Sequence, residues 1–412
     1  METSEAPVSS ESQKPREPNK WRRWLIISSI VAASIMLGLF LWLLFTVFMP
    51  KPSPPQTVLP AKSTIKPTLT TQAIVSGYDH IWDIRFLPTN EMLFTERTTG
   101  KIYIQQNNNV RTLTALADVY SSGEGGLLGL EVDPNFTENH YIYACFDSTK
   151  PGMAKPDVRV ARFVVAGDLM SVTGRTDIVT GMPVTSGRHS GCRVKIGPDG
   201  YLWIGTGDSA AGGVAIDHKN LGGKILRVDR DGKAAPGNLG GDFDPRIYSY
   251  GHRNVQGLAF FPTPQNGVLG VNVEHGSSED DEVNLLEPGN FGWAPPVGEY
   301  TELNVKMTDK TQFPDAIDAI WSSGTPTIAP SGATFLSGKG WLAWDGALAV
   351  AVLKDKYLLV LDINTDNKVT STEKVLVDSF GRLRTAVAGP DSNLYISTDN
   401  GKTDQIIRVT PH

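Results

Sequence analysis

The chain has 412 residues, of which 40% are hydrophobic and 20% are charged, and its formal net charge is −6 at pH 7. A chain of this length can bury a large core, but no basic block outside the N-terminal tail offers the positive surface that nucleic acids require. The composition therefore excludes a nucleic-acid-binding protein and leaves small molecules and sugars as ligands.

The first two segments predict a membrane anchor. Residues 1–23 are polar, mixed in charge and without an apolar face, which is typical of a disordered tail. Residues 24–49 carry no charge and exceed the roughly 20 apolar residues that cross a bilayer, whereas a cleaved signal peptide has a shorter apolar region followed by small residues. Because five Lys or Arg precede this segment and only Lys51 follows it closely, we predict a single-pass anchor in the cell membrane, with the N-terminus cytoplasmic and the remaining chain extracytoplasmic.

The next segment predicts a spacer. Residues 50–72 contain six prolines among Ser, Thr and Lys, a composition that gives an extended, semi-rigid chain. Residues 73–412 are long for one domain, but a closed ring of repeated units grows to this size around one axis. We therefore expect a single domain from residue 73 to the end.

This domain repeats one phrase, which is a Pro or Asp-Gly turn, an alternating apolar strand and a polar or Gly-rich close. Its copies begin at Phe86, Val132, Ile196, Phe260, Phe335 and Ala388, of which the copy at Phe335 is the weakest. No copy can bury its apolar face alone, so such units stack around an axis. The sequence predicts an all-β fold, a six-bladed β-propeller, with function in the loops inserted between strands.

The two cysteines, Cys145 and Cys192, leave two interpretations open. An extracytoplasmic location permits a disulfide between them, but the sequence does not show that their Cα atoms approach within bonding range, and two buried thiols fit equally well. The chain has no CxxC motif and no His/Cys cluster with zinc spacing, so we do not expect zinc.

A candidate general base lies at one strand end. His189 precedes a strand whose closing turn carries Asp208, so the two side chains can meet at one mouth of the propeller. A neutral imidazole beside a carboxylate is a suitable base at pH 7. Taken alone, a surface histidine and a turn aspartate are the simpler interpretations of these two residues.

Two further loops carry polar side chains beside glycine. Arg253 follows His252 and offers a planar cation to a carbonyl or developing oxyanion, although a lone Arg is more often paired to a structural carboxylate. Residues 279–282 are all acidic and lie among Gly and Ser, which suggests the oxygen ligands of calcium. They lack the EF-hand spacing, and a solvated acidic loop is the alternative.

Three cations occur near the C-terminus. Lys354 lies within an otherwise apolar strand, where its burial without a partner is costly. Arg382 and Arg384 are two residues apart and so point to one side of an extended segment. They can clamp the carboxylates of a ligand, and strand-edge charges that discourage aggregation are the alternative. With the histidine and the acidic loop, these cations describe a pocket for a polyanionic ligand and a proton-transfer step.

Ordered motifs give a family resemblance over about Ile74 to Pro411. The segments are GRHSGCRVKIGPDG, GTGD, LGGKILRVDRDG, GHRNVQGLAF, EHGSSEDDEVNLL with NFGW, APSG and GRLRT. They resemble the motifs of soluble quinoprotein glucose dehydrogenases and related aldose sugar and sorbosone dehydrogenases. The resemblance implies a six-bladed propeller that binds pyrroloquinoline quinone (PQQ) and calcium and oxidises the anomeric hydroxyl of an aldose to a lactone.

The resemblance also implies residue roles. His189 takes the hydroxyl proton while hydride passes to the quinone, Asp208 orients this histidine, and Arg253 and Asn254 lie at the quinone oxygens. The remaining implied positions are Lys354, Arg382 and Arg384 at the cofactor carboxylates, Gly276 and Ser277 as carbonyl ligands of calcium, and Glu282 at a second, structural calcium.

Glu124 departs from the family pattern, because it stands where the glucose enzymes have a neutral amide facing the substrate. A carboxylate there alters sugar preference, so glucose itself is not predicted. The anchor suggests an electron acceptor close to the membrane, whose identity the sequence does not reveal. Two alternatives are a non-catalytic extracytoplasmic propeller that binds a ligand or carbohydrate, and a calcium-dependent lactonase, which has no use for the three cations.

Overall fold

The computed structural model describes residues 21, 24, 34–40, 63–149, 152, 155–262 and 267–412. Two compact units, 1–61 and 62–412, are distinguished. In the first unit residues 34–40 are helical and exposed. No helix within the described residues is long and apolar enough to cross a membrane. The predicted tail apart from residue 21, and most of the anchor predicted over residues 24–49, lie outside the described residues.

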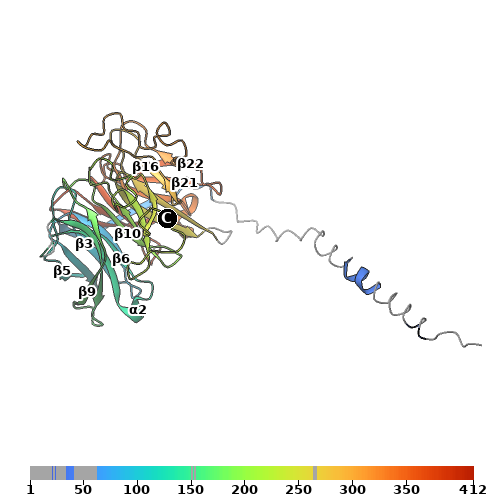
Figure 1. Cartoon of the computed structure of the whole chain (residues 1–412). Helices are drawn as coiled ribbons and strands as arrows, with labels where there is room; N and C mark the ends of the chain where they lie inside the picture. The colour runs from blue at the N-terminus through green and yellow to red at the C-terminus, as the bar shows by residue number, and fades with distance from the viewer. Residues whose placement is uncertain are drawn as a thin grey trace, which may run out of the picture. The chain divides into compact units, whose positions relative to one another are not determined.

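The second unit is a six-bladed β-propeller, which confirms the predicted fold (Figure 1). Its six sheets are arranged so that each innermost strand contacts the innermost strands of both neighbouring blades, and the last contacts the first. These innermost strands are β2 (Ile81–Phe86), β6 (Leu127–Val132), β10 (Gly191–Ile196), β14 (Val255–Pro262), β19 (Pro330–Phe335) and β23 (Leu383–Ala388).

The other strands extend each blade outward. Blades one and two add β3 (Met92–Glu96), β4 (Lys101–Gln106), β5 (Asn109–Ala115), β7 (Tyr141–Ser148), β8 (Asp157–Val165) and β9 (Val172–Pro183). Blade three adds β11 (Leu202–Thr206), β12 (Lys224–Val228), β13 (Ile247–Tyr250) and β17 (Gly289–Asn290). Blade four adds β15 (Val268–Glu274), β16 (Glu282–Leu285) and β18 (Trp321–Ser322). Blade five adds β20 (Leu348–Val352), β21 (Leu358–Ile363) and β22 (Val369–Val375).

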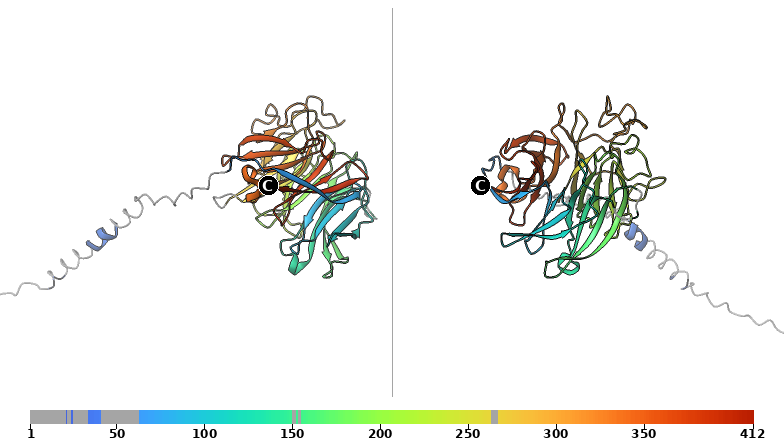
Figure 2. Two further views of the ribbon diagram at one scale, coloured as in Figure 1. Left: turned by 180° about the vertical axis from the view of Figure 1, so that it is seen from behind. Right: turned by 90° about the vertical axis from the view of Figure 1, so that its left-hand side faces the viewer.

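Blade six combines both ends of the domain. It contains β24 (Leu394–Thr398), β25 (Asp404–Pro411) and β1 (Leu69–Tyr78), and Figure 2 shows the blue N-terminal strand beside the red C-terminal ones. Leu69 lies opposite Pro411 and Tyr78 opposite Asp404, so chain ends that are distant in sequence close the ring by strand pairing. Residues 69–72, which the sequence assigned to the spacer, therefore belong to a strand of the propeller.

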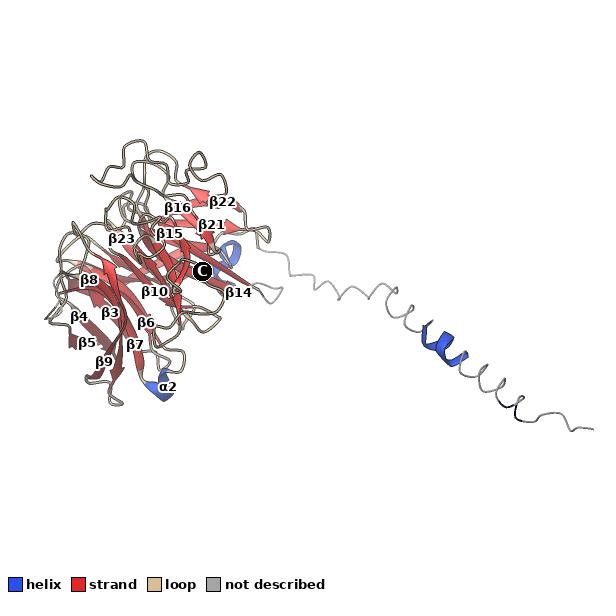
Figure 3. Ribbon diagram, viewed as in Figure 1, coloured by secondary structure: helices blue, strands red, loops and turns tan. Residues whose placement is uncertain are grey.

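Two short helices lie among the described residues of the propeller, α2 (Phe136–Asn139) and η1 (Lys339–Trp344). The other described residues of the domain form strands and loops, and several loops gather near β16 and β22 (Figure 3).

In the connections that the structure describes, the turn of the repeated phrase lies between the first and second strands of a blade. In blade three, the Gly197 amide donates to the Tyr201 carbonyl at 2.9 Å, and Gly200 adopts a φ of +79°, which glycine tolerates without steric cost. Each blade needs this turn because its first two strands are antiparallel neighbours. The six repeats therefore correspond to the six blades.

Apolar side chains fill the space between neighbouring blades. Between blades two and three, Tyr143 and Val160 pack with Val194 and Ile204, and all four are buried. Cys145 and Cys192 form a disulfide within this layer, with a Cα–Cα distance of 5.5 Å. Of the two interpretations of the cysteines, the structure has the disulfide.

The disulfide should contribute strongly to stability. Replacing Cys145 and Cys192 together with alanine should lower the free energy of unfolding by about 4 kcal/mol, because the bridge closes a loop between residues 47 apart and restricts the unfolded chain. Urea unfolding of the oxidised wild type and the double variant measures this difference. Reductant should destabilise the wild type and leave the variant unchanged; equal stability of the two oxidised proteins would contradict the prediction.

Candidate functional site

A cavity of about 320 Å³ lies on the propeller axis. All six blades contribute to it, through residues in or just before the innermost strands and, in blades four and five, through residues that follow the second strand, His275, Leu353 and Lys354. We call it the axial cavity, and its lining residues are Trp82, Glu124, Leu128, Ser190, Gly191, Gln256, His275, Ala329, Leu353, Lys354, Arg382 and Arg384. The lining combines apolar side chains with three cations, which suits a partly apolar ligand with anionic substituents.

The three predicted cations all line the axial cavity, but their surroundings differ. Arg384 is buried, and its guanidinium pairs with the Asp399 carboxylate. The Arg382 side chain is 44% exposed, and its Nη2 lies 3.8 Å from the same carboxylate. Lys354 is exposed, and its Nζ donates to the Thr327 carbonyl at 2.7 Å. Arg382 and Lys354 are therefore the cations most available to a ligand.

Burial opposes the charge on Asp399, but Arg384 more than compensates for it. Burial alone raises the pKa of this carboxyl, whereas the adjacent guanidinium lowers it, and the net pKa is below the usual value. Asp399 is thus an ionised partner that holds Arg384 in place. The interpretation of these arginines as strand-edge charges is wrong for Arg384, because its side chain points into the molecule.

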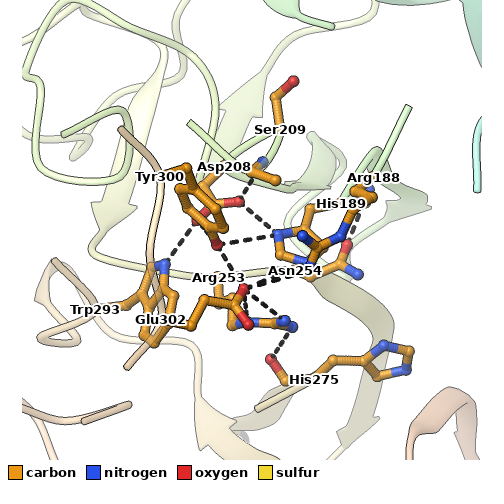
Figure 4. A network of polar contacts seen from close by, with 12 residues as sticks. Arg188, His189, Asp208, Ser209, Arg253, Asn254, His275, Trp293, Tyr300 and Glu302 are labelled. Atoms are coloured by element: carbon orange, nitrogen blue, oxygen red, sulfur yellow. Dashed lines mark hydrogen bonds and ion pairs between the residues drawn. The ribbon is translucent and has the colours of Figure 1, made fainter. Parts of the chain in front are cut away.

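His189 and Asp208 meet as predicted (Figure 4). The His189 Nδ1 lies 2.7 Å from the Asp208 Oδ1, and both side chains are buried. Trp293 donates through Nε1 to the other carboxylate oxygen at 2.7 Å. A carboxylate at Nδ1 favours the tautomer that carries its proton there, which leaves the lone pair on Nε2. The pair is therefore arranged as a base with its acceptor nitrogen turned away from Asp208.

Glu124 and Asn254 fix the backbone around this histidine. The Glu124 Oε2 accepts the His189 amide at 2.8 Å and lies 3.4 Å from the Asn254 Nδ2. The Asn254 Oδ1 accepts the Gly191 amide at 3.1 Å. His189 has a φ of +55°, a left-handed conformation that these bonds stabilise. Glu124 thus serves the histidine backbone and also presents its carboxylate to the axial cavity.

Arg253 is paired with a carboxylate, as the simpler interpretation of a lone Arg expects. Its Nη2 and Nε donate to the Glu302 Oε1 at 2.8 and 3.2 Å, and its Nη1 donates to the His275 carbonyl at 3.2 Å. The Arg253 backbone amide donates to the Glu274 Oε2 at 2.8 Å. The guanidinium therefore lies beside the axial cavity, with part of its charge already balanced by Glu302.

Three carboxylates of the acidic loop accept hydrogen bonds from the protein itself. Its carboxylates accept bonds from neighbouring loops, Glu279 from the Thr325 hydroxyl, Asp280 from Ser322 and Asp281 from the amides of Gly276 and Ala329. In the part of the chain that the structure describes, no group of three or more His, Cys, Asp or Glu side chains is placed to hold a metal ion. Three of the four carboxylates thus fasten loops together.

Glu282 is buried beside another carboxylate. It accepts from Thr308 and Asn284 at 3.1 and 3.2 Å, and burial, assisted by Glu274, raises its pKa to about 8. Gly276 and Ser277 lie in the adjoining loop, and neither lines the axial cavity. Among the described residues, no donor bonds to their carbonyl oxygens. These carbonyls remain candidate ligands for a hard cation.

Asp147 adds a buried carboxyl next to Ser190, which lines the cavity. Ser190 donates to its Oδ2 at 3.0 Å, while no described residue bonds to its Oδ1. Burial raises the pKa of Asp147 to about 7, and the nearby carboxylates of Asp157 and Glu124 add to this shift. An unfolded Asp ionises near pH 4, so between about pH 4 and 7 the folded protein holds a proton that the unfolded chain has released.

Stability should therefore fall as pH rises through this window. The Asp147→Asn variant should lose this part of the pH dependence, which amounts to at most about 4 kcal/mol between the limits of the window. Urea unfolding of both proteins at about pH 5 and about pH 8 tests it. If the two proteins lose the same stability between these values, the raised pKa of Asp147 is wrong.

Sequence reasoning missed several members of this site. Asp399 closes the second strand of its blade, as Asp208 does in blade three, so comparison of the repeats contains a signal for it. Trp293 lies in the NFGW motif but received no role. Tyr300 and Glu302 lie in the long loop after β17, whose sequence has no periodicity that points to a site.

Comparison with known proteins adds to this geometry. Residues 78–408 match the family described as Glucose / Sorbosone dehydrogenase. An aldose sugar dehydrogenase of Escherichia coli is 30% identical, over 84% of this chain and 93% of its own length. Quinoprotein glucose dehydrogenase B of Acinetobacter calcoaceticus is 26% identical, over 86% of this chain and 90% of its own. The PQQ-bound aldose sugar dehydrogenase of Streptomyces coelicolor has a TM-score of 0.69 at 28% identity, covering 84% of this chain and 99% of its own.

Proposed function

Because this chain belongs to the glucose/sorbosone dehydrogenase family, we propose that it is a PQQ- and calcium-dependent oxidoreductase that converts the anomeric hydroxyl of an aldose to a lactone. The observation that carries the proposal is the buried His189–Asp208 pair beside a cavity with three cations. A base at a cationic, partly apolar cavity is what alcohol oxidation by an anionic organic cofactor requires.

The residues present fit this cofactor. Lys354 and Arg382 would hold its carboxylates, and the buried Arg384 would add positive charge. Trp82 and Leu353 supply apolar contacts. His275 also lines the cavity, and its buried Nε2 has no partner among the described residues. Burial, together with Arg253, lowers the pKa of His275 well below its usual value, so this histidine stays neutral as a hydrogen-bonding group.

Calcium would bind through the free carbonyls of Gly276 and Ser277, and Glu282 would serve a second, structural calcium. Bound PQQ supplies the acceptor for the two electrons that the sugar loses. Asn284 donates to both Glu274 and Glu282, so two buried carboxylates lie close together, and a bound cation would offset their mutual repulsion.

The residues of the chain would divide the proton chemistry between them. Asp208 holds the His189 proton at Nδ1, so Nε2 accepts the proton of the anomeric hydroxyl. The imidazolium that forms is stabilised by the Asp208 carboxylate at 2.7 Å. Arg253 lies 3.2 Å from the His275 carbonyl, next to the cavity, where its guanidinium can stabilise negative charge that develops on reduction. Asn254 and Glu124 keep the histidine in its productive orientation.

We further propose that residues 24–49 anchor the enzyme in the cell membrane, with the propeller extracytoplasmic and an electron acceptor near the membrane. The Cys145–Cys192 disulfide supports this location, because disulfides persist in oxidising compartments. A sugar would then be oxidised outside the cytoplasm.

Reconstitution of the full chain with PQQ and calcium tests the activity. Addition of aldoses should bleach the quinone absorbance in proportion to the enzyme present. If the folded protein binds PQQ but no aldose changes the spectrum, the dehydrogenase proposal fails. If it binds sugars but not PQQ, the protein is a carbohydrate-binding propeller.

A further inference from the structure

A further carboxylate, that of Glu302, lies beside His189 in the candidate site. The loop between β17 and β18 brings Glu302 to Arg253 and to the Tyr300 phenol, which donates to its Oε1 at 2.7 Å. The same oxygen lies 3.7 Å from the His189 Nε2, the nitrogen assigned as the proton acceptor (Figure 4). Glu302 thus borders the space in which the reacting hydroxyl must lie.

Glu302 carries its negative charge at neutral pH. Burial alone raises the pKa of this carboxyl, but Arg253 and the Tyr300 hydroxyl lower it, and the net pKa is below the usual value. The side chain is 21% exposed, so a ligand can reach it from solvent. Its Oε2 has no bonded partner within the described residues, which leaves one oxygen for a sugar hydroxyl or an ammonium group.

Arg188 is the second charged residue at this edge. Its side chain is 50% exposed, and its Nη2 lies 3.4 Å from the His189 Nε2 and 3.6 Å from the Glu302 Oε1. The guanidinium also lies 5.9 Å from the Tyr300 ring centre. These contacts are long, so the Arg188 guanidinium retains N–H donors for a ligand. The negative charge of Glu302 weakens the attraction that Arg188 exerts on anions.

The charges around the reacting position are therefore balanced. Arg188 and Arg253 contact Glu302, and the Glu124 carboxylate accepts the backbone amide of His189. A sugar carboxylate placed here meets two like charges, which offset the attraction that the two arginines would otherwise exert on it. A neutral sugar meets hydrogen-bonding groups without this repulsion.

We infer that Glu302 is a specificity-determining residue that makes the enzyme select neutral aldoses and reject sugar acids such as uronic acids. The inference rests on the proposed function. Neutralising Glu302 frees Arg188 and Arg253 to bind an anion, so the same site then accepts a hexuronate.

The test compares D-glucuronate with D-glucose on the full chain carrying Glu302→Gln. Glutamine keeps the size of the side chain and removes its charge. The ratio of dissociation constants, glucuronate over glucose, should fall at least about tenfold relative to wild type, since a change of about 1.4 kcal/mol is tenfold. Glu299→Gln is the matched control, because Glu299 is an exposed carboxylate of the same loop, and it should leave the ratio unchanged.

Two measurements separate this inference from the proposed function. Calorimetry of the cofactor-free protein gives the binding ratio, and quinone bleaching of the loaded enzyme gives the ratio of kcat/KM for the two sugars. If no sugar is oxidised but the binding ratio shifts, the dehydrogenase proposal fails and the charge selection stands. Adding Arg188→Gln to Glu302→Gln should reverse most of the gain for glucuronate.

Two results would overturn the inference. One is a wild-type protein that binds glucuronate as tightly as glucose. The other is a Glu302→Gln variant whose ratio matches that of Glu299→Gln, because the loop carboxylate then has no influence on substrate charge.

Discussion

His189→Ala should lose turnover by about a hundredfold to ten-thousandfold while still binding PQQ, because this is the range that a positioned general base contributes. The imidazole is buried and held by Asp208 at 2.7 Å. His189 is not among the residues that line the axial cavity, where the three cations lie. Turnover and cofactor affinity should therefore separate. Quinone bleaching measures the first, and titration of the cofactor absorbance measures the second.

A second His–Asp pair supplies the control. The His218 Nδ1 lies 2.8 Å from the Asp242 Oδ2, a contact like that of His189, but both residues lie on the surface. His218→Ala should leave turnover unchanged. Asp208→Asn should reduce turnover with His189 still present, because the amide no longer fixes the tautomer. An active His189→Ala enzyme would remove this histidine from the mechanism.

Arg384→Ala should destabilise the fold by about 3–5 kcal/mol, because it removes the closest partner of the buried Asp399 carboxylate and leaves only the longer contact with Arg382. Asp399 is 6% exposed and Arg384 is 7% exposed. Arg384→Ala combined with Asp399→Ala should recover much of this loss, since the double change removes both charges. Urea unfolding of the three proteins measures it, and equal destabilisation by the single and double changes would argue against a buried ion pair.

The exposed cations should affect the cofactor instead. Arg382→Ala and Lys354→Ala should each weaken PQQ binding by about tenfold or more, the usual worth of a charge-assisted hydrogen bond, with little change in unfolding. Lys356→Ala is the matched control, because Lys356 is a half-exposed lysine that does not line the axial cavity. Unchanged cofactor titration in both variants would show that Arg382 and Lys354 do not bind the carboxylates of the cofactor.

Local sequence was sufficient for the architecture of the propeller domain. The repeated turn and alternating strand recur because every blade must join two antiparallel strands and bury an apolar face against its neighbours. Six copies of this pattern therefore predicted six sheets. The His189–Asp208 contact was also predictable, since both residues stand at strand ends that meet at one mouth. The cluster of Lys354, Arg382 and Arg384 followed from the same reasoning.

Tertiary structure alone decided which charges neutralise one another. Asp399 forms an ion pair with Arg384, and Glu302 forms one with Arg253. Glu302 lies in a loop whose sequence has no periodicity, so the second pair could not be recognised from the sequence. The pairing of β1 with β25, which closes the ring, could not be predicted from local sequence either, because it joins the two ends of the domain. Turns and alternating strands depend on neighbouring residues and can be recognised locally, whereas the pairing of distant charges and strands depends on where the closed ring brings them.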